Sequence, residues 1–123
     1  IEIWKKEMKA TIDSRNQVPT SAGLASSASG FAALATAANI ASGLNLGPRE
    51  LSIYARQGSG SASRSIYGGL VEWQKGENKD DSYAISLDKA DWDIGMIIVL
   101  VNSGKKAISS RKAMKLTVES SPL

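Results

Sequence analysis

Hydrophobic runs and alternations predict four strands in this chain. The first 18 residues mix β-forming and charged side chains, and apolar and polar positions alternate near their middle, as in a half-buried strand. Residues 66–73 and 82–87 have the composition of two strands joined through a polar turn at 76–81. Residues 96–101, Met-Ile-Ile-Val-Leu-Val, form a continuous apolar run, which is typical of a strand covered on both faces.

Three helices are predicted beside these strands. Residues 31–41 are rich in Ala and predict a helix buried on most sides, which Gly43 would end at a C-cap position. Pro48 suits the first turn of a second helix over residues 49–57, and a third is expected at 112–120. Strands and helices together predict an α+β fold.

Composition restricts the chemistry that the chain can perform. Its 123 residues include neither Cys nor His, which excludes disulfides, thiolate nucleophiles, Cys-ligated metals and imidazole acid–base catalysis. Hydroxyls, backbone amides, Lys, Arg and carboxylates remain. This set suits a site that handles phosphates better than a hydrolytic or redox site.

Charge and hydropathy exclude two classes of partner. Fifteen Lys and Arg residues face twelve Asp and Glu residues, and because the basic residues are dispersed we expect no nucleic-acid partner. No apolar run approaches the ~20 residues of a membrane-spanning helix, so no membrane partner is expected. Residues 1–7 contain neither an initiator Met nor the regions of a signal peptide, and we expect the sequence to be a piece of a longer one.

The first small-residue segment, residues 19–30, leads directly into the first predicted helix. The amides of a helix N-terminus lack intrahelical partners and favour anions, so a Gly/Ser loop there suits phosphate. It is not a Walker A motif, because no Gly-Lys-Ser/Thr triplet occurs. Backbone amides and the hydroxyls of Ser26 and Ser27 would hold the phosphates. The same composition also suits a structural role, with serines capping the helix and alanines packing it.

The second segment, residues 58–65, partly matches the Gly-x-Gly-x-x-Gly fingerprint of dinucleotide-binding proteins. Ser63 stands where the third Gly belongs, and a strand rather than a helix is expected to follow. The segment does offer several hydroxyls and Arg64, whose planar fork binds a carboxylate or phosphate through two parallel hydrogen bonds. The alternative for Arg64 is a surface or structural ion pair.

A third anion-suited segment is Lys105-Lys106-x-x-Ser109-Ser110-Arg111, at the expected start of the last helix. Cationic side chains, hydroxyls and free amides together suit a diphosphate. The alternative is a solvated turn followed by an N-cap.

Three motifs in this order carry a family resemblance. They are Asn16-x-x-Pro-Thr-Ser-Ala-Gly-Leu-Ala-Ser-Ser-Ala28, Gly58-Ser-Gly-Ser-Ala-Ser-Arg-Ser-Ile-Tyr-Gly-Gly69 and Lys105-Lys-x-x-Ser-Ser110. The first resembles the ATP loop of the GHMP kinase superfamily, Pro-x-x-x-Gly-Leu-x-Ser-Ser-Ala. All three together resemble the diphosphomevalonate decarboxylase family within it, over essentially the whole chain.

The resemblance implies a fold and an activity. It implies a GHMP kinase-like (ribosomal protein S5 domain 2-like) N-terminal lobe in residues 1–93 and the first strand and helix of the second lobe in residues 94–123. The implied activity is ATP-dependent decarboxylation of mevalonate 5-diphosphate to isopentenyl diphosphate, with Mg²⁺, in the mevalonate pathway of isoprenoid biosynthesis. The implied full-length enzyme is cytoplasmic and homodimeric.

The resemblance also implies site residues. Those on the ATP phosphates would be Gly23, Leu24, Ala25, Ser26, Ser27 and Ala28. Ser27 would serve the γ-phosphate and Mg²⁺. Ser59, Gly60 and Ser61 would contact mevalonate diphosphate, and Arg64 would bind its carboxylate. Ser110 and Arg111 would lie against the substrate diphosphate on a mobile loop.

Two family elements are missing from this sequence. An upstream Lys-Tyr-x-Gly-Lys-like segment and a downstream catalytic Asp do not occur, and the aspartates at 80, 81, 88, 91 and 93 lie outside any family motif. The fragment alone is therefore expected to be inactive. Two alternatives stay open: a GHMP-type mevalonate kinase that does not decarboxylate, and an inactive nucleotide-binding fragment.

Overall fold

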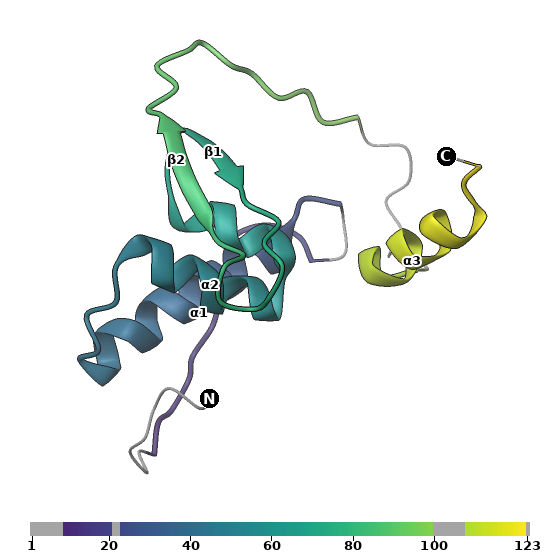
Figure 1. The fold of residues 1–123 in the computed structure, drawn as a ribbon. Helices are drawn as coiled ribbons and strands as arrows, with labels where there is room; N and C mark the ends of the chain where they lie inside the picture. Colours follow the sequence, from purple (N-terminus) through teal and green to yellow (C-terminus); the bar gives the residue numbers. More distant parts are fainter. Residues whose placement is uncertain (1–8, 21–22, 100–107, 123) are drawn as a thin grey trace. The chain divides into compact units, whose positions relative to one another are not determined.

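A computed structural model describes residues 9–20, 23–99 and 108–122 (Figure 1). In chain order the elements are α1 (Ser26–Ser42), α2 (Pro48–Gly58), the 3₁₀ helix η1 (Gly60–Ile66), β1 (Leu70–Trp73), β2 (Ala84–Asp88) and α3 (Ser110–Ser120). The chain divides into two compact units. The first contains residues 27–92 and the N-terminal residues up to Arg15, and the second contains residues 16–26 and those from Asp93 onward.

Helix α1 begins earlier than its Ala-rich run predicts. It starts at Ser26, so the end of the predicted phosphate loop forms its first turn, and Gly43 ends it with a positive φ of 66°. The expectation of burial on most sides is wrong, because only Ala28 and Ala32 are buried and the Phe31 side chain is 40% exposed. Small side chains four residues apart form one narrow stripe, and this stripe alone is covered.

Helix α2 agrees closely with its prediction. Pro48 occupies the first turn, where its missing N–H costs no helical hydrogen bond, and the Gly47 N–H donates to Glu50 Oε2 at 3.1 Å. Leu51, Ser52 and Ala55 form its buried face. The helix ends at Gly58, and one extended residue, Ser59, connects it to η1.

Strands β1 and β2 form an antiparallel hairpin. Leu70 pairs with Asp88 and Trp73 with Ala84, with an irregularity after Leu70. The first strand is shorter than predicted, because Ile66 belongs to η1 and residues 67–69 are irregular. The polar turn at 76–81 is confirmed, and in it the Asp81 carboxylate accepts backbone hydrogen bonds from Glu77 and Asn78.

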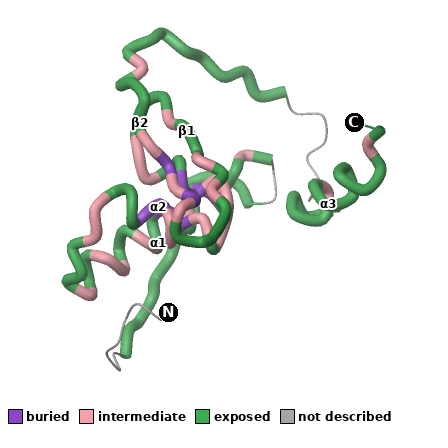
Figure 2. The backbone as a smooth tube through the Cα atoms, in the orientation of Figure 1, coloured by how far each residue is buried: buried purple, intermediate pink, exposed green. Residues whose placement is uncertain are grey.

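The core of the first unit consists mainly of small side chains. Figure 2 shows the buried residues gathered around α1, α2 and the adjoining part of the hairpin. They are Ala28, Ala32, Leu51, Ala55, Ala62 and Ala84, with Ser52, Ser63 and Ser82 among them. Ser52 Oγ donates to the Arg49 carbonyl at 2.6 Å and accepts from the Ala84 N–H at 2.9 Å, so a buried hydroxyl connects α2 to β2.

Two predicted strands are not present in the described residues. Residues 9–18 and 96–99 are irregular, and residues 1–8 and 100–101 lie outside the described part. The apolar side chains at 96–99 are all more than 60% exposed. A strand needs a neighbour for its backbone hydrogen bonds, and neither segment has one among the residues described.

Helix α3 lies in the second unit and begins two residues before its predicted start. Ser109 is its N-cap, with Oγ accepting from the Lys112 N–H at 3.3 Å. Lys115 and Glu119 form an exposed pair one turn apart, at 3.7 Å. In the described ranges no helix is long and apolar enough to cross a bilayer.

Candidate functional site

Three hydroxyls from two predicted motifs form a row in the first unit. Ser27 Oγ in the first turn of α1 lies 3.3 Å from Ser59 Oγ, which lies 3.4 Å from Ser61 Oγ in η1. Ser27 and Ser59 are 32 residues apart in the chain. Ser27 is exposed and the other two are half-buried, so the row is open to solvent. The structure thus brings together the residue predicted for the γ-phosphate and two predicted for the substrate.

Close packing explains the two glycines of the second motif. A Cβ on Gly58 would overlap the ring of Phe31, and one on Gly60 would lie 2.8 Å from Cη2 of Trp73. Such distances require the neighbour to move. Both glycines therefore have a steric reason to be present, and the predicted role of Gly60 on the substrate remains a prediction.

Arg64 lies in η1 with its side chain exposed. Its guanidinium carbon is 5.9 Å from the centroid of the Trp73 ring, within the range of a cation–π contact. Within residues 9–20, 23–99 and 108–122, no ion pair involves this side chain. The alternative of a structural ion pair is therefore not found in that part of the chain.

The segment before α1 has an unusual backbone. Gly23 has a φ of +80° and Ala25 a φ of +52°, and the helix begins at the next residue. A left-handed Ala is strained, and such strain is concentrated at binding sites. Ala28 is buried. Leu24 and Ser26 are half-buried, and Ser21 and Ala22 lie outside the described residues.

The donors around Ser27 fit magnesium bound together with phosphates. Mg²⁺ prefers oxygen ligands and usually keeps waters and substrate phosphates in its shell. The described ranges hold no group of three acidic side chains that would form a protein cage. A hydroxyl such as that of Ser27 is therefore the kind of single protein ligand that a phosphate-bound ion would use.

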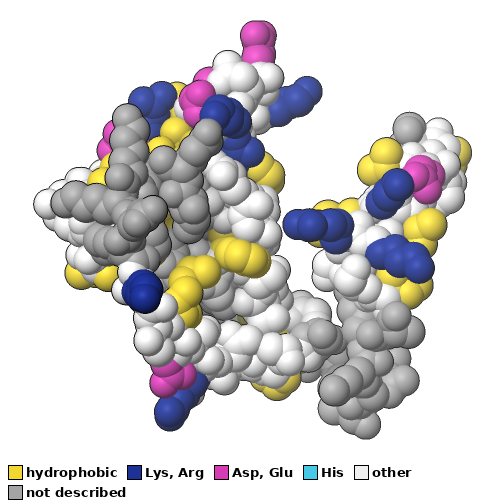
Figure 3. All heavy atoms as spheres, turned by 90° about the horizontal axis from the view of Figure 1, so that it is seen from below, with side chains coloured by type: hydrophobic (Ala, Val, Ile, Leu, Met, Phe, Trp, Pro, Cys, Tyr) yellow, Lys and Arg dark blue, Asp and Glu magenta, His cyan; other side chains and the backbone are white. Residues whose placement is uncertain are grey.

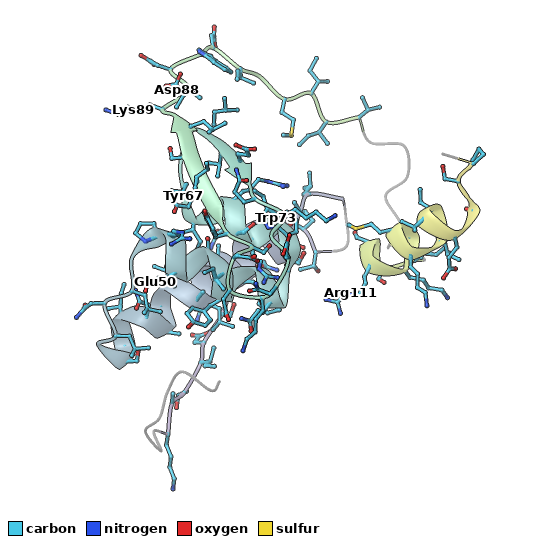
Figure 4. The ribbon with its side chains drawn as sticks, in the orientation of Figure 1. Glu50, Tyr67, Trp73, Asp88, Lys89 and Arg111 are labelled. Carbon is cyan, nitrogen blue, oxygen red and sulfur yellow. The ribbon has the colours of Figure 1, made fainter. Side chains whose placement is uncertain are left out.

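The third motif lies in the second unit. Ser110 is the first residue of α3, and Arg111 follows it, exposed (Figure 4). The N-cap alternative is confirmed for Ser109, whose hydroxyl caps the helix. Lys105 and Lys106 lie outside the described residues.

Among the residues that the structure describes, two ionisable groups have shifted pKa values. Backbone hydrogen bonds from Glu77 and Asn78 lower the pKa of Asp81, which is therefore a turn-stabilising carboxylate. Partial burial raises the pKa of Tyr67, and the positive charge of Arg49 opposes that shift. Neither group belongs to the hydroxyl row.

Sequence reasoning missed Trp73 and Ser82. Trp73 was predicted only as a strand residue, yet its indole contacts Gly60 and Arg64, and its Nε1–H donates to Ser82 Oγ at 3.0 Å. No spacing or motif in the sequence signals this contact, which depends on how the hairpin folds back over η1.

Charged side chains of both signs occur on each unit. Figure 3 shows Lys and Arg at several separate places on the visible face, with acidic side chains between some of them. Neither unit shows a continuous basic stripe among the side chains drawn on that face.

Comparison with known proteins gives a consistent result. A family model described as the diphosphomevalonate decarboxylase-like N-terminal domain matches residues 2–84. Diphosphomevalonate decarboxylase from Ganoderma lucidum is 51% identical over 116 residues, covering 91% of this chain and 29% of the relative. The human enzyme is 44% identical over 119 residues, covering 94% of this chain and 29% of the relative. The chain thus spans less than a third of these relatives.

Solved structures agree with these relatives. One of "MDDEF in complex with MVAPP, AMPPCP and Magnesium" has a TM-score of 0.67 and 51% identity over 83% of this chain and 32% of that one. Mevalonate diphosphate decarboxylase from Staphylococcus aureus has a TM-score of 0.55 and 60% identity over 58% of this chain and 22% of that one. The mixed α+β architecture of this chain matches part of those structures.

Proposed function

This chain belongs to the diphosphomevalonate decarboxylase-like family, and we propose that it supplies the ATP side of an enzyme that decarboxylates mevalonate 5-diphosphate. The product would be isopentenyl diphosphate, in the mevalonate pathway. The related decarboxylases are similar to nearly all of this chain, while it spans under a third of their length. The activity therefore belongs to the protein that contains this segment together with the remaining parts of the site.

The distance between Ser27 and Ser59 carries the proposal. Ser27 is the residue assigned to the γ-phosphate, Ser59 is assigned to the substrate, and their hydroxyls are 3.3 Å apart. Phosphoryl transfer needs donor and acceptor held in line and in contact, and most of its catalysis is positioning and charge stabilisation. Hydroxyls from the two motifs, side by side, support one site that receives both substrates.

The segment from Gly23 to Ala28 would bind the ATP phosphates. The segment leads into the N-terminus of α1, where the helix dipole favours negative charge. Ser27 would provide a hydroxyl to the γ-phosphate and to Mg²⁺. When bound, the ion would neutralise charge on the transferring phosphoryl group. Leu24, Ala25, Ser26 and Ala28 would contribute through their backbone.

Arg64 would orient the substrate carboxylate. The γ-phosphoryl of ATP passes to the tertiary hydroxyl oxygen, whose proton would go to the family's catalytic Asp outside this sequence, and the C–O bond then breaks with loss of inorganic phosphate. The electron pair of the bond to the carboxylate forms the new double bond as carbon dioxide leaves. That bond must be aimed at the electron-deficient carbon, and two parallel hydrogen bonds from one guanidinium fix a carboxylate plane.

The remaining assignments follow the same family pattern. Ser59, Gly60 and Ser61 would contact mevalonate diphosphate, and Ser110 and Arg111 would bind its diphosphate. Residues 1–93 would belong to a GHMP-type N-terminal lobe and residues 94–123 to the start of the second lobe. The complete enzyme would be a cytoplasmic homodimer.

Product analysis tests the proposal directly. The protein containing this segment is incubated with Mg-ATP and mevalonate diphosphate, and ADP, inorganic phosphate and carbon dioxide are measured together. Equal amounts of all three support a decarboxylase. ADP with a stable phosphorylated product and no carbon dioxide indicates the kinase alternative. No ADP above a substrate-free control contradicts both.

A further inference from the structure

Trp73 contacts two residues of the predicted substrate motif with different parts of its ring. Its Cη2 edge packs so closely on Gly60 that a Cβ there would be 2.8 Å away. The guanidinium carbon of Arg64 lies 5.9 Å from the ring centroid. Gly60 begins η1 and Arg64 lies four residues later in the same helix, so one indole spans the part of η1 assigned to the substrate.

The indole itself is held firmly by the hairpin. Its Nε1–H donates to Ser82 Oγ at 3.0 Å, and Ser82 is 4% exposed. The Ser82 hydroxyl donates in turn to the Gln74 carbonyl at 3.2 Å. The backbone of Trp73 pairs with Ala84, which is fully buried and whose N–H donates to Ser52 at 2.9 Å. Both backbone and ring edge are thus restrained.

Arg64 has no comparable restraint of its own. Its side chain is exposed, and in the described ranges no hydrogen bond or ion pair fixes its guanidinium. A free Arg side chain populates many rotamers, and binding a ligand through it costs rotamer entropy. An aromatic face restricts the guanidinium while leaving its N–H groups available, because the ring interacts with the cation's face.

We infer that Trp73 is a positioning residue, which holds the Arg64 guanidinium in the orientation that binds the substrate carboxylate. This inference rests on the proposed function. Trp73 touches no reacting atom in this scheme. It acts through Arg64, and the close fit of its ring edge against Gly60 only helps to hold the ring in place.

A double-mutant cycle in the protein containing this segment tests the inference. Trp73→Leu removes the aromatic face and is expected to lower kcat/KM for carbon dioxide release by roughly 2- to 30-fold, the range of a cation–π contact. Trp73→Phe keeps an aromatic face and should retain most activity. In an Arg64→Ala background, Trp73→Leu should cause no further loss, because the residue through which it acts is gone.

Two controls separate positioning from stability. Trp92→Leu removes the same side chain at a position 57% exposed and should leave kcat/KM unchanged. If Trp73→Leu does not fold, Ser82→Ala replaces it in the cycle. Ser82→Ala keeps the ring of Trp73 but removes the acceptor of its N–H, so it should lower kcat/KM when Arg64 is present. In the Arg64→Ala background it should cause no further loss.

The outcomes distinguish failure of the positioning role of Trp73 from failure of the proposed decarboxylase function. Equal losses from Trp73→Leu with and without Arg64, or a Trp73→Phe variant as impaired as Trp73→Leu, overturn the positioning role while leaving the proposed function intact. If the unsubstituted protein releases no carbon dioxide from mevalonate diphosphate, the proposed function fails, and the inference fails with it.

Discussion

The ring of Phe31 in α1 lies directly on Gly58 at the end of α2, where a Cβ would overlap ring atoms Cγ, Cδ1 and Cε1. The contact connects the helix that carries Ser27 to the segment that carries Ser59. It brings two chain segments together at a point where no side chain fits between them. The arrangement of the hydroxyl row depends on this close approach.

Gly58→Ala is therefore expected to destabilise the fold. Forcing a methyl group into a filled space costs about 1–3 kcal/mol of unfolding free energy, since Phe31 must move. Urea unfolding of the variant and the unsubstituted chain measures the difference. Gly30→Ala is the matched control, because nothing lies within 4 Å of its Cβ position and Ala is the better helix former, so it should be neutral or stabilising. Equal stability of Gly58→Ala and Gly30→Ala would contradict the contact.

Ser52 gives a second stability prediction. Ser52→Ala leaves the buried Ala84 N–H without its acceptor, and an unsatisfied buried donor costs about 1–3 kcal/mol. Chemical denaturation measures the loss, and faster hydrogen exchange at the Ala84 amide assigns it to this bond. Ser86→Ala removes an exposed hydroxyl from β2, the strand that contains Ala84, and should change the free energy of unfolding by less than about 0.5 kcal/mol. Similar effects of the two changes would exclude a special role for Ser52.

Local signals predicted the elements that depend on neighbours in sequence. Pro48, Gly43 and the polar turn at 76–81 each act within a few residues, and the structure confirms them. The predicted strands at 1–18 and 96–101 depend on partners from elsewhere in a sheet. No such partner occurs among the described residues, so the hydrophobic pattern alone was insufficient there.

In the candidate site, too, local composition was predictable from the sequence, while contacts between distant segments were not. The Gly/Ser composition of two segments suggested hydroxyls near phosphate, but their approach within 3.3 Å depends on packing between segments 32 residues apart. The contact of Trp73 with Arg64 also depends on how the hairpin lies over η1. Sequence spacing carries no information on either distance.

Arg64→Lys should lose activity although the charge is kept. Lys supplies a point charge without the planar pair of donors, and losing a charge-assisted hydrogen bond costs about 1.5–3 kcal/mol, or roughly 10- to 150-fold in kcat/KM. Carbon dioxide release by the protein containing this segment is the measurement. Arg15→Lys, at a largely exposed surface pair with Asp13, should have no effect. A normal rate for Arg64→Lys would remove the carboxylate-binding role.

The lowered pKa of Asp81 leads us to expect that the stability of the hairpin turn depends on pH. Its pKa is lowered by backbone hydrogen bonds from Glu77 and Asn78, so the folded state favours the ionised form. The stabilisation is fully present above the ordinary Asp pKa of 3.8 and is lost as the pH falls through the lower folded value. NMR titration should show the Asn78 amide shifting with a midpoint below 3.8. In Asp81→Asn this transition should disappear, and a midpoint above the ordinary value would show that the hydrogen bonds do not hold.

Ser27 gives a prediction that connects the hydroxyl row to magnesium. If its hydroxyl serves the γ-phosphate and the ion, Ser27→Ala should slow ADP formation and raise the Mg²⁺ concentration needed for half-maximal rate. Loss of one hydrogen bond to a charged group corresponds to roughly 10- to 150-fold in rate. Ser27→Thr keeps the hydroxyl and should recover much of the activity. Ser61→Ala, one hydroxyl further along the row from Ser27, should change the KM for mevalonate diphosphate and leave the Mg²⁺ requirement as it is. A Ser27→Ala protein with an unchanged Mg²⁺ requirement would exclude Ser27 as a ligand, because the metal would then have lost nothing from its shell.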